Sequence, residues 1–350
     1  MGIEISVLIT AYNRKKYLKE AVRSVLESSI NRDLYEIIVV KNFTEIEIDS
    51  FLSQNQVIVV NTTDENIGKQ IALGLDKASG AVISFLDDDD KFEKDKLSIV
   101  LSEFKDPSLI YYHNLSSPIG EESTLLKGSV IQPIKTQLLL LPDTVENLIH
   151  SLSTRKDMTH YTLMFNLSCV SMRKEVLLKN RVYLERIIDG TDHFAFYISI
   201  MENMKMKFDA KFLTLYRIHK SASNLLSVEF IPRKIGPESV RLFLEPNHYS
   251  KVLDDATRGT KTNSLIKCKL LEESLLLNVL SLNRKRYFKF ADFFHYLHCL
   301  KVNSRPSVKN YIVRFLFVTI ALVLPYPAGV FYLMRKYRKY RNRLDQRIRT

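Results

Sequence analysis

The first hundred residues alternate between strand-like and helix-like segments, and this alternation is the feature that most limits the possible folds. Short runs rich in Val, Ile and Leu occupy residues 4–9, 36–40, 56–60 and 81–86. Such runs are typical of strands buried on both faces of a sheet. Apolar residues at helical spacing lie between them, over 15–28 and 68–78. An α/β fold with a mostly parallel, doubly wound sheet is therefore predicted.

The composition narrows the class of protein further. With 350 residues, 46% of them hydrophobic, the chain can bury a sizeable core in about two domains. Ten glycines, ten prolines and three cysteines exclude collagen, wholesale disorder and a disulfide scaffold. Cys169, Cys268 and Cys299 match no zinc-binding spacing, so we expect buried thiols in a reducing compartment. The first residues lack a basic stretch, and no signal peptide is expected.

The net charge of +12 is concentrated toward the carboxyl-terminal end of the chain. The last fifty residues hold twelve Lys or Arg and one acid, which gives +11, whereas residues 1–300 carry a net charge of +1. The basic character therefore belongs to a tail and not to a nucleic-acid-binding body, and no nucleic acid partner is expected.

Four adjacent carboxylates, Asp87 to Asp90, follow the fourth predicted strand. Ligands of doubly wound sheets bind beyond the carboxyl ends of the strands. Adjacent carboxylates repel one another unless a cation compensates them, and Mg²⁺ typically binds one or two carboxylates together with substrate phosphates. A solvated acidic turn that caps the next helix is the alternative interpretation. The position at a strand end favours a metal and phosphate site.

Five groups of residues together resemble the family 2 glycosyltransferases of GT-A fold. They are SVLITAYNR at 6–14, EIIVV at 36–40, NIG at 66–68 with GAVISFLDDDD at 80–90, DGTDHF at 189–194 and LYRIHKS at 215–221. The resemblance implies transfer of a sugar from a nucleotide diphosphate sugar, with Mg²⁺ or Mn²⁺ offsetting the charge that develops on the leaving diphosphate. It also implies a GT-A domain over residues 1–225, with a nucleotide-binding half, 1–105, and an acceptor half, 106–225.

The same resemblance implies roles for individual residues. Asp192 aligns with the catalytic carboxylate, which takes the proton of the acceptor hydroxyl in an inverting transfer. A plain helix N-cap is the alternative for Asp192, and Asp189 competes with it for either role. The implied metal ligands are Asp87, Asp89 and His219. The positions expected to bind the nucleotide sugar are Thr10, Ala11, Tyr12, Arg14, Asn42, Lys69, Asp88 and Asp89.

One position departs from the family pattern. After the second strand the family usually has a pair of Asp residues, and the first accepts a hydrogen bond from uracil. This chain has Lys41 and Asn42 there. Lysine can only donate, although the Asn42 carbonyl could accept. A UDP-sugar is therefore not assumed as the donor, and a GDP-sugar is a competitor.

The carboxyl-terminal third combines helical and apolar signals. Leu-rich helical spacing predicts a helical extension over 226–310, notably at 264–282. Residues 315–334 carry no charge and are numerous enough to cross a hydrocarbon core. Pro325 and Pro327 interrupt this stretch, so a straight helix is not expected.

Basic residues flank the apolar stretch on both sides, with four in 301–314 and eight in 335–350. A simple span would place the tail in the cytoplasm and the catalytic domain outside, away from nucleotide sugars. We therefore predict that 311–334 lies in, or re-enters, one leaflet, with the basic tail, 335–350, on anionic headgroups. A plain span and a buried helix of a soluble domain are the alternatives.

These observations predict a membrane-associated, metal-dependent, inverting glycosyltransferase at the cytoplasmic face of the cell membrane. The expected acceptor is presented there, as a lipid-linked saccharide, a polysaccharide or a polyprenyl phosphate. A non-catalytic nucleotide-sugar-binding scaffold and a nucleotidyltransferase are the alternatives. The second would be expected to carry a Gly-rich phosphate loop near the first strand, and residues 10–14 contain no glycine.

Overall fold

The chain divides into two compact units. The first comprises residues 1–145 and 157–219, and the second comprises 146–156 and 220–350. The computed structural model describes residues 2–127, 138–140, 163–219 and 247–260, together with 262–263, 266–267 and 270. In the second unit, helix α12 spans Asn247–Ala256.

Most of the predicted helical extension lies outside the described residues, as do the apolar stretch 315–334 and the basic tail. The predicted domain bounds therefore stay predictions. Within the part of the chain that the structure does describe, no helix combines the length and the apolar character needed to cross a membrane.

Strands of the first unit form one mixed sheet. Among the described residues it has nine strands, in the order β3-β2-β1-β4-β8-β6-β9-β5, with β7 beside β9. The strands are β1 Ile5–Ala11, β2 Tyr35–Lys41, β3 Ile58–Asn61, β4 Val82–Asp87, β5 Lys91–Phe92, β6 Leu109–Ile119, β7 Leu138–Leu140, β8 Val170–Arg173 and β9 Lys205–Arg217.

The half of the sheet built from β1 to β4 matches the prediction. These four strands run parallel, with β1 between β2 and β4. Every residue of β1 and β2 is buried, as the apolar runs predicted, whereas the edge strand β3 is partly exposed. Thr10 at the end of β1 pairs with Val40 on one side and with Asp87 on the other. The carboxyl ends of these strands therefore meet at one edge.

The other half of the sheet corrects the expectation of a mostly parallel arrangement. Strand β8 runs antiparallel to both β4 and β6, and β5 and β7 run antiparallel to β9. Among the described strands of this half, β6 and β9 are the pair that runs parallel. Parallel neighbours need a crossover connection, usually a helix, and the regular strand–helix alternation of the first hundred residues does not continue beyond them.

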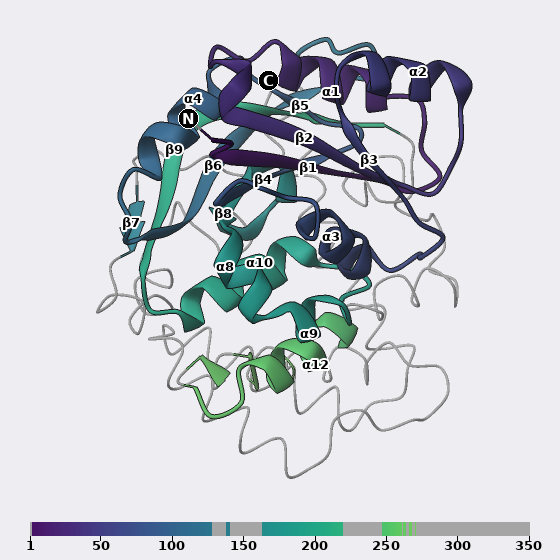
Figure 1. Ribbon diagram of the computed structural model, residues 1–350. Helices are drawn as coiled ribbons and strands as arrows, with labels where there is room; N and C mark the ends of the chain where they lie inside the picture. Colours follow the sequence, from purple (N-terminus) through teal and green to yellow (C-terminus); the bar gives the residue numbers. More distant parts are fainter. Residues whose placement is uncertain are drawn as a thin grey trace, which may run out of the picture. The chain divides into compact units, whose positions relative to one another are not determined.

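Helices cover both faces of the parallel half (Figure 1). Val7 on β1, Val22 on α1 and Leu52 on α2 belong to one buried cluster, while Gly74 of α3 lies against Leu8 and Val40 on the opposite face. The helices of the first unit are α1 Leu18–Leu26, α2 Ile46–Gln54, α3 Ile67–Leu75, α4 Lys96–Glu103, α8 Lys174–Lys179, α9 Arg181–Leu184 and α10 Thr191–Met201, with 3₁₀ turns at Arg32–Leu34 and Leu167–Cys169.

The start of α3 packs closely against the segment after α9. The Gly68 N–H donates to the Ile187 carbonyl over 2.9 Å, and a Cβ at Gly68 would lie 1.8 Å from the Leu184 carbonyl oxygen. Replacing Gly68 by Ala is therefore expected to destabilise the fold by about 3 kcal/mol, the upper range for overpacking, because backbone must move. Urea unfolding measures this. Gly120→Ala is the control, since its nearest obstacle is the Thr124 hydroxyl at 3.3 Å; equal losses would contradict the prediction.

Candidate active site

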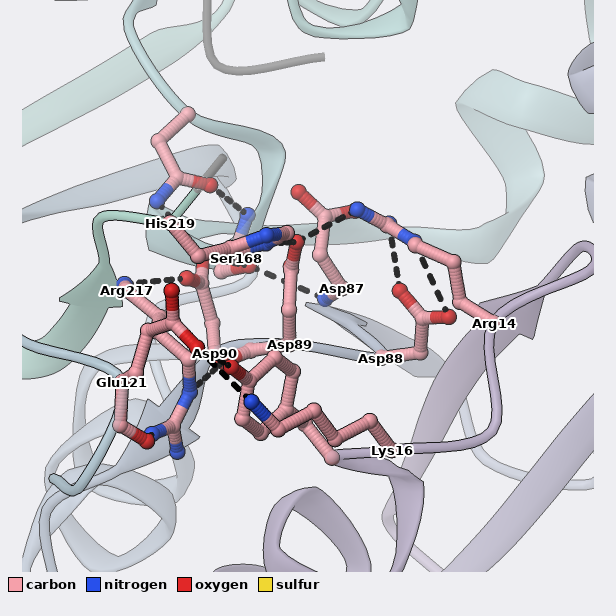
Figure 2. Close-up of polar contacts among 12 residues, drawn as sticks. Arg14, Lys16, Asp87, Asp88, Asp89, Asp90, Glu121, Ser168, Arg217 and His219 are labelled. Atoms are coloured by element: carbon pink, nitrogen blue, oxygen red, sulfur yellow. Dashed lines mark hydrogen bonds and ion pairs between the residues drawn. The ribbon is translucent and has the colours of Figure 1, made fainter. Parts of the chain in front are cut away.

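Asp87 is the half-buried last residue of β4, paired with Thr10 at the end of β1. Asp88, Asp89 and Asp90 form the buried turn from β4 to β5 (Figure 2). Asp88 and Asp90 are each 1% exposed and Asp89 is 7% exposed, so the interpretation as a solvated acidic turn is wrong. The pKa of Asp87 is raised to about 7, first by burial and then by the charges of Asp89 and Asp192, against the opposing effect of Arg14. Burial likewise raises the pKa of Asp88 and Asp90 well above the usual range.

Asp90 holds the turn in place. One of its carboxylate oxygens accepts hydrogen bonds from Asn166 Nδ2 at 2.8 Å and Ser168 Oγ at 2.7 Å, and the other accepts from the Arg217 backbone N–H at 2.9 Å. Ser168 Oγ also accepts a bond from the Asp87 N–H. The sequence reasoning gave Asp90 no role, and Asn166 and Ser168 carried no signal because they lie far away in the chain.

Arg14 bridges two of the carboxylates. Its Nε donates to Asp88 Oδ2 at 3.2 Å, Nη2 pairs with Asp88 Oδ1, and Nη1 lies 2.5 Å from Asp89 Oδ2. Figure 2 shows the guanidinium reaching across the turn from the segment after β1. The structure therefore brings Arg14 and both aspartates together, as expected for members of one site.

The three predicted metal ligands also lie together. His219 Nε2 is 2.8 Å from Asp89 Oδ2, and the ring of His219 packs against that of Tyr17, with 5.4 Å between ring centroids. Carboxylate oxygens of Asp87, Asp89 and Asp90 lie within 4.8 Å of one another. Such a set of hard oxygen donors fits Mg²⁺ or Mn²⁺. The ligand roles themselves stay predictions.

Arg217 is a site residue that the sequence reasoning did not single out, although it lies in the same motif as His219. Its fully buried side chain donates from Nε to the Asp89 carbonyl at 2.7 Å, from Nη1 to the Glu121 carbonyl at 2.6 Å and from Nη2 to Glu20 at 2.9 Å. The guanidinium also lies over the Tyr17 ring, 4.3 Å from its centroid. Arg217 thus ties the acidic turn to α1 and to the loop after β6.

Asp192 lies in the first turn of α10. Gly190, with φ of 73°, takes the N-cap position and makes no side-chain cap, so the N-cap interpretation of Asp192 is wrong. Asp192 Oδ1 accepts the His193 N–H at 2.8 Å and lies 2.8 Å from His193 Nδ1. The competing Asp189 accepts the Gly190 N–H at 2.7 Å. The charge of Asp192 also raises the pKa of Asp87, by less than burial and Asp89 do.

The predicted nucleotide-binding positions line the same sheet edge. Thr10 and Ala11 are buried at the end of β1. The hydroxyl of the half-buried Tyr12 bonds Glu65, which raises the pKa of Tyr12 above its usual value. Asn42 exchanges two hydrogen bonds with Asn13, and the exposed Lys69 pairs with Asp64 at 2.9 Å. A pocket of about 620 Å³ is lined by Thr63, Asp64, Glu65, Asn66 and Ile188.

Residues 6–180, half of the chain, match the sequence profile described as "Glycosyl transferase family 2". The chain belongs to this family. Membership of this family favours a glycosyltransferase over the alternative of a nucleotidyltransferase.

Two curated relatives share about a quarter of their residues with this glycosyltransferase where they align. The putative teichuronic acid biosynthesis glycosyltransferase TuaG of Bacillus subtilis is 29% identical over 151 residues, which are 41% of this chain and 58% of TuaG. The uncharacterized glycosyltransferase RC0461 of Rickettsia conorii is 28% identical over 158 residues, 41% of this chain and 26% of that protein. This chain thus spans between 26% and 58% of these relatives' lengths.

Solved structures of S. aureus TarS, residues 1–349, share the GT-A-like α/β fold. The complex with UDP matches with a TM-score of 0.58 at 13% identity, over 96% of this chain and 92% of that chain. The complex with UDP-GlcNAc matches with a TM-score of 0.57 at 13% identity, over the same shares. At this identity the likeness shows the fold alone.

Lys41 lies at the end of β2, where the resemblance led us to expect the first residue of an Asp pair. Its side chain is 2% exposed and its Nζ pairs with Asp49 of α2 at 2.9 Å. The same nitrogen donates to the Phe43 carbonyl at 2.5 Å and to Asn61 Oδ1 at 3.2 Å. The sequence reasoning recognised that lysine offers no acceptor, but it did not foresee that Asp49 would neutralise the buried ammonium group.

A second buried lysine contacts Ser168, one of the residues that hold Asp90. Lys96, at the start of α4, is 0% exposed, and its Nζ donates to the Ser168 carbonyl and to Thr214 Oγ1. The ammonium group also lies 3.9 Å from the centroid of the Phe92 ring. Burial lowers the pKa of Lys96 from the usual 10.5 to about 7.

Lys96 is expected to make the stability of the enzyme rise with pH. Between pH 7 and 10.5 the unfolded chain holds the Lys96 proton and the native chain does not, so the free energy of unfolding increases across this window. Below about pH 7 both states hold the proton and the contribution is constant. Urea unfolding across the window should show the rise in wild type and in the exposed Lys94→Met control, but a reduced rise in Lys96→Met. An unchanged slope in Lys96→Met would contradict the prediction.

Proposed function

We propose that this glycosyltransferase transfers a sugar from a nucleotide diphosphate sugar to an acceptor, with inversion at the anomeric carbon. One observation carries the proposal: carboxylate oxygens of Asp87, Asp89 and Asp90 lie within 4.8 Å of one another at the carboxyl end of β4. The charge of Asp192 also raises the pKa of Asp87. An inverting transfer needs these two functions close together, a cation-supported diphosphate site and a base.

Asp87 and Asp89 would hold Mg²⁺ or Mn²⁺, with His219 beside Asp89 as the third ligand. When bound, the cation would offset the charge that develops on the leaving diphosphate. Asp90 has a different role, because both of its oxygens already accept hydrogen bonds from Asn166, Ser168 and Arg217. Asp90 fixes the conformation of the turn that carries Asp89.

Asp192 serves as the general base toward a hydroxyl acceptor. Its carboxylate takes the hydroxyl proton while the acceptor oxygen bonds to the anomeric carbon, and the bond from that carbon to the diphosphate breaks with its electron pair leaving on the diphosphate. The two hydrogen bonds to His193 hold the carboxylate in one orientation. About a fifth of the Asp192 side chain stays exposed, so an acceptor can approach it.

The donor nucleotide would lie along Thr10, Ala11, Tyr12 and Asn42, with its ribose at Asp88. Its diphosphate would face Arg14, Lys69 and the cation held at Asp89. TarS was crystallised with UDP-GlcNAc, which supports a nucleotide sugar as the class of donor. The nucleobase of the donor is left open between uracil and guanine. Lys41 already donates to Asp49, Phe43 and Asn61, and it offers no acceptor to a uracil ring.

The acceptor is proposed to be presented at the cytoplasmic face of the cell membrane, as a lipid-linked saccharide, a polysaccharide or a polyprenyl phosphate. The support is the distribution of charge, with +11 in the last fifty residues around the apolar stretch 315–334. Cysteine labelling of the tail in sealed vesicles tests this: labelling from the catalytic side supports an in-plane or re-entrant segment, and labelling only from the far side contradicts it.

Product stereochemistry tests the inverting transfer. Incubation with α-linked UDP-, GDP- and dTDP-sugars, Mn²⁺ and membrane acceptors should yield a β-linked product, which NMR distinguishes by its anomeric coupling. A product that retains the α linkage would contradict a single displacement with Asp192 as base.

A further inference from the structure

Arg14 engages the same carboxylate oxygen that His219 engages. Asp89 Oδ2 lies 2.5 Å from Arg14 Nη1 and 2.8 Å from His219 Nε2, on the two sides of the turn seen in Figure 2. The remaining guanidinium nitrogens contact Asp88, whose side chain is 1% exposed. A rigid guanidinium fork matches carboxylates well, so Arg14 supplies the positive charge that these buried groups require.

A divalent cation at Asp89 Oδ2 competes with Arg14, because both are positively charged and the guanidinium lies 2.5 Å from that oxygen. His219 can stay in place, since its side chain is 7% exposed and packs on Tyr17, and as the proposed third ligand it would bind the cation instead of donating to Asp89. The Arg14 side chain is 33% exposed and belongs to the segment after β1 that also carries the nucleotide-binding positions. Arg14 is therefore the donor that has room to move.

We propose that Arg14 is an exchangeable counter-ion for the acidic turn. It holds Asp88 and Asp89 together before the cation arrives, releases Asp89 Oδ2 to the cation, and then pairs with the donor diphosphate. The inference rests on the proposed function, because it places the cation at Asp89. The cation sets Arg14 free for the diphosphate, and the diphosphate draws Arg14 away from Asp89. The cation and the diphosphate therefore each favour the binding of the other.

Direct binding of Mn²⁺ to the full chain tests the proposal without any turnover. In the absence of nucleotide, Arg14→Met should bind Mn²⁺ about tenfold more tightly than wild type, equivalent to about 1.4 kcal/mol, because no guanidinium has to be displaced. At saturating Mn²⁺, the same variant should bind UDP and GDP about tenfold more weakly, because the diphosphate has lost its partner. Electron paramagnetic resonance of free Mn²⁺ and calorimetry of the nucleotides give the two values.

Two further variants test whether the contacts of Arg14 with Asp88 and Asp89 matter, or only its positive charge. Lys16→Met removes a nearby charge that pairs with Glu121 instead of the turn, and its Mn²⁺ affinity should stay within about twofold of wild type. Arg14→Lys keeps the charge but lacks the fork, so it should tighten Mn²⁺ several-fold. Equal tightening in Arg14→Met and Lys16→Met, or wild-type Mn²⁺ affinity in Arg14→Met, would overturn the proposal.

The outcomes also separate this inference from the proposed function. If wild type binds Mn²⁺, Asp89→Asn does not, and Arg14→Met is unchanged, then the metal site stands and only the exchange by Arg14 fails. If no variant binds Mn²⁺ with or without nucleotide, or Asp89→Asn binds it as tightly as wild type, then both the metal site and the exchange fail.

Discussion

Replacing Asp192 by Asn is expected to lower kcat for a hydroxyl acceptor by about 10²–10⁴-fold, the usual contribution of a positioned general base. Asparagine still accepts the His193 N–H bond through its carbonyl, so α10 keeps its start, but it cannot take a proton. The affinity for the donor should change little. Initial rates at saturating donor and acceptor measure the loss.

Asp189→Asn is the matched control for this substitution. Asp189 lies three residues before Asp192 and bonds only the neighbouring Gly190 N–H among the contacts described. Asp189→Asn should retain transfer within a few-fold of wild type. If it lost more activity than Asp192→Asn, then Asp189 and not Asp192 would be the general base.

With a confirmed phosphate acceptor, Asp192→Asn should keep more activity than with a hydroxyl acceptor, because a phosphate is already ionised and needs no base. Abolished transfer to such an acceptor would contradict this part of the account.

Asp89→Asn is expected to lower kcat/KM by about 10³-fold, because the turn loses the negative charge that would hold the cation on the leaving diphosphate. Its melting temperature should stay at or above that of wild type, because the substitution removes one of several buried charges that repel one another. Metal titration of transfer activity, together with a thermal melt, measures both effects.

Comparison with Asp90→Asn distinguishes a loss of catalysis from a loss of thermal stability. Asp90 accepts bonds from Asn166, Ser168 and the Arg217 backbone, and an amide nitrogen would face one of these donors. This variant should lose thermal stability as well as activity. If Asp89→Asn destabilised the protein as much as Asp90→Asn, then the separate roles assigned to the two carboxylates would be wrong.

The parallel half of the fold could be predicted because each of its strands is a short apolar run bounded by a helix. The rule that ligands bind at the carboxyl ends of such strands then located the acidic turn and the residues after β1. The mixed half could not be predicted in the same way. Strands β6, β8 and β9 are paired by contacts between distant segments, and no local period encodes whether β8 runs parallel or antiparallel to β4.

The same limit applies to the site. Asp87, Asp89 and His219 were recognisable from motifs, but the groups that hold them were not. Ser168 reaches the turn from 78 residues away in the chain, and Arg217 reaches Glu20 from 197 residues away. Lys41 was recognised as a departure from the family, yet its ion pair with Asp49 depends on how α2 packs against β2. The motifs predicted which groups carry the chemistry, whereas the packing that orients those groups is a property of the folded chain.

The most direct test of the account is metal-dependent recognition of the donor by the wild-type enzyme. A panel of UDP-, GDP- and dTDP-sugars, each with and without Mn²⁺ or Mg²⁺, can be scored by thermal shift and by release of the nucleoside diphosphate. The account predicts that at least one donor raises the melting temperature and is hydrolysed only when the cation is present, and that Asp89→Asn loses both responses. A wild-type enzyme that responds to no donor, or that responds equally well without a divalent cation, would contradict it.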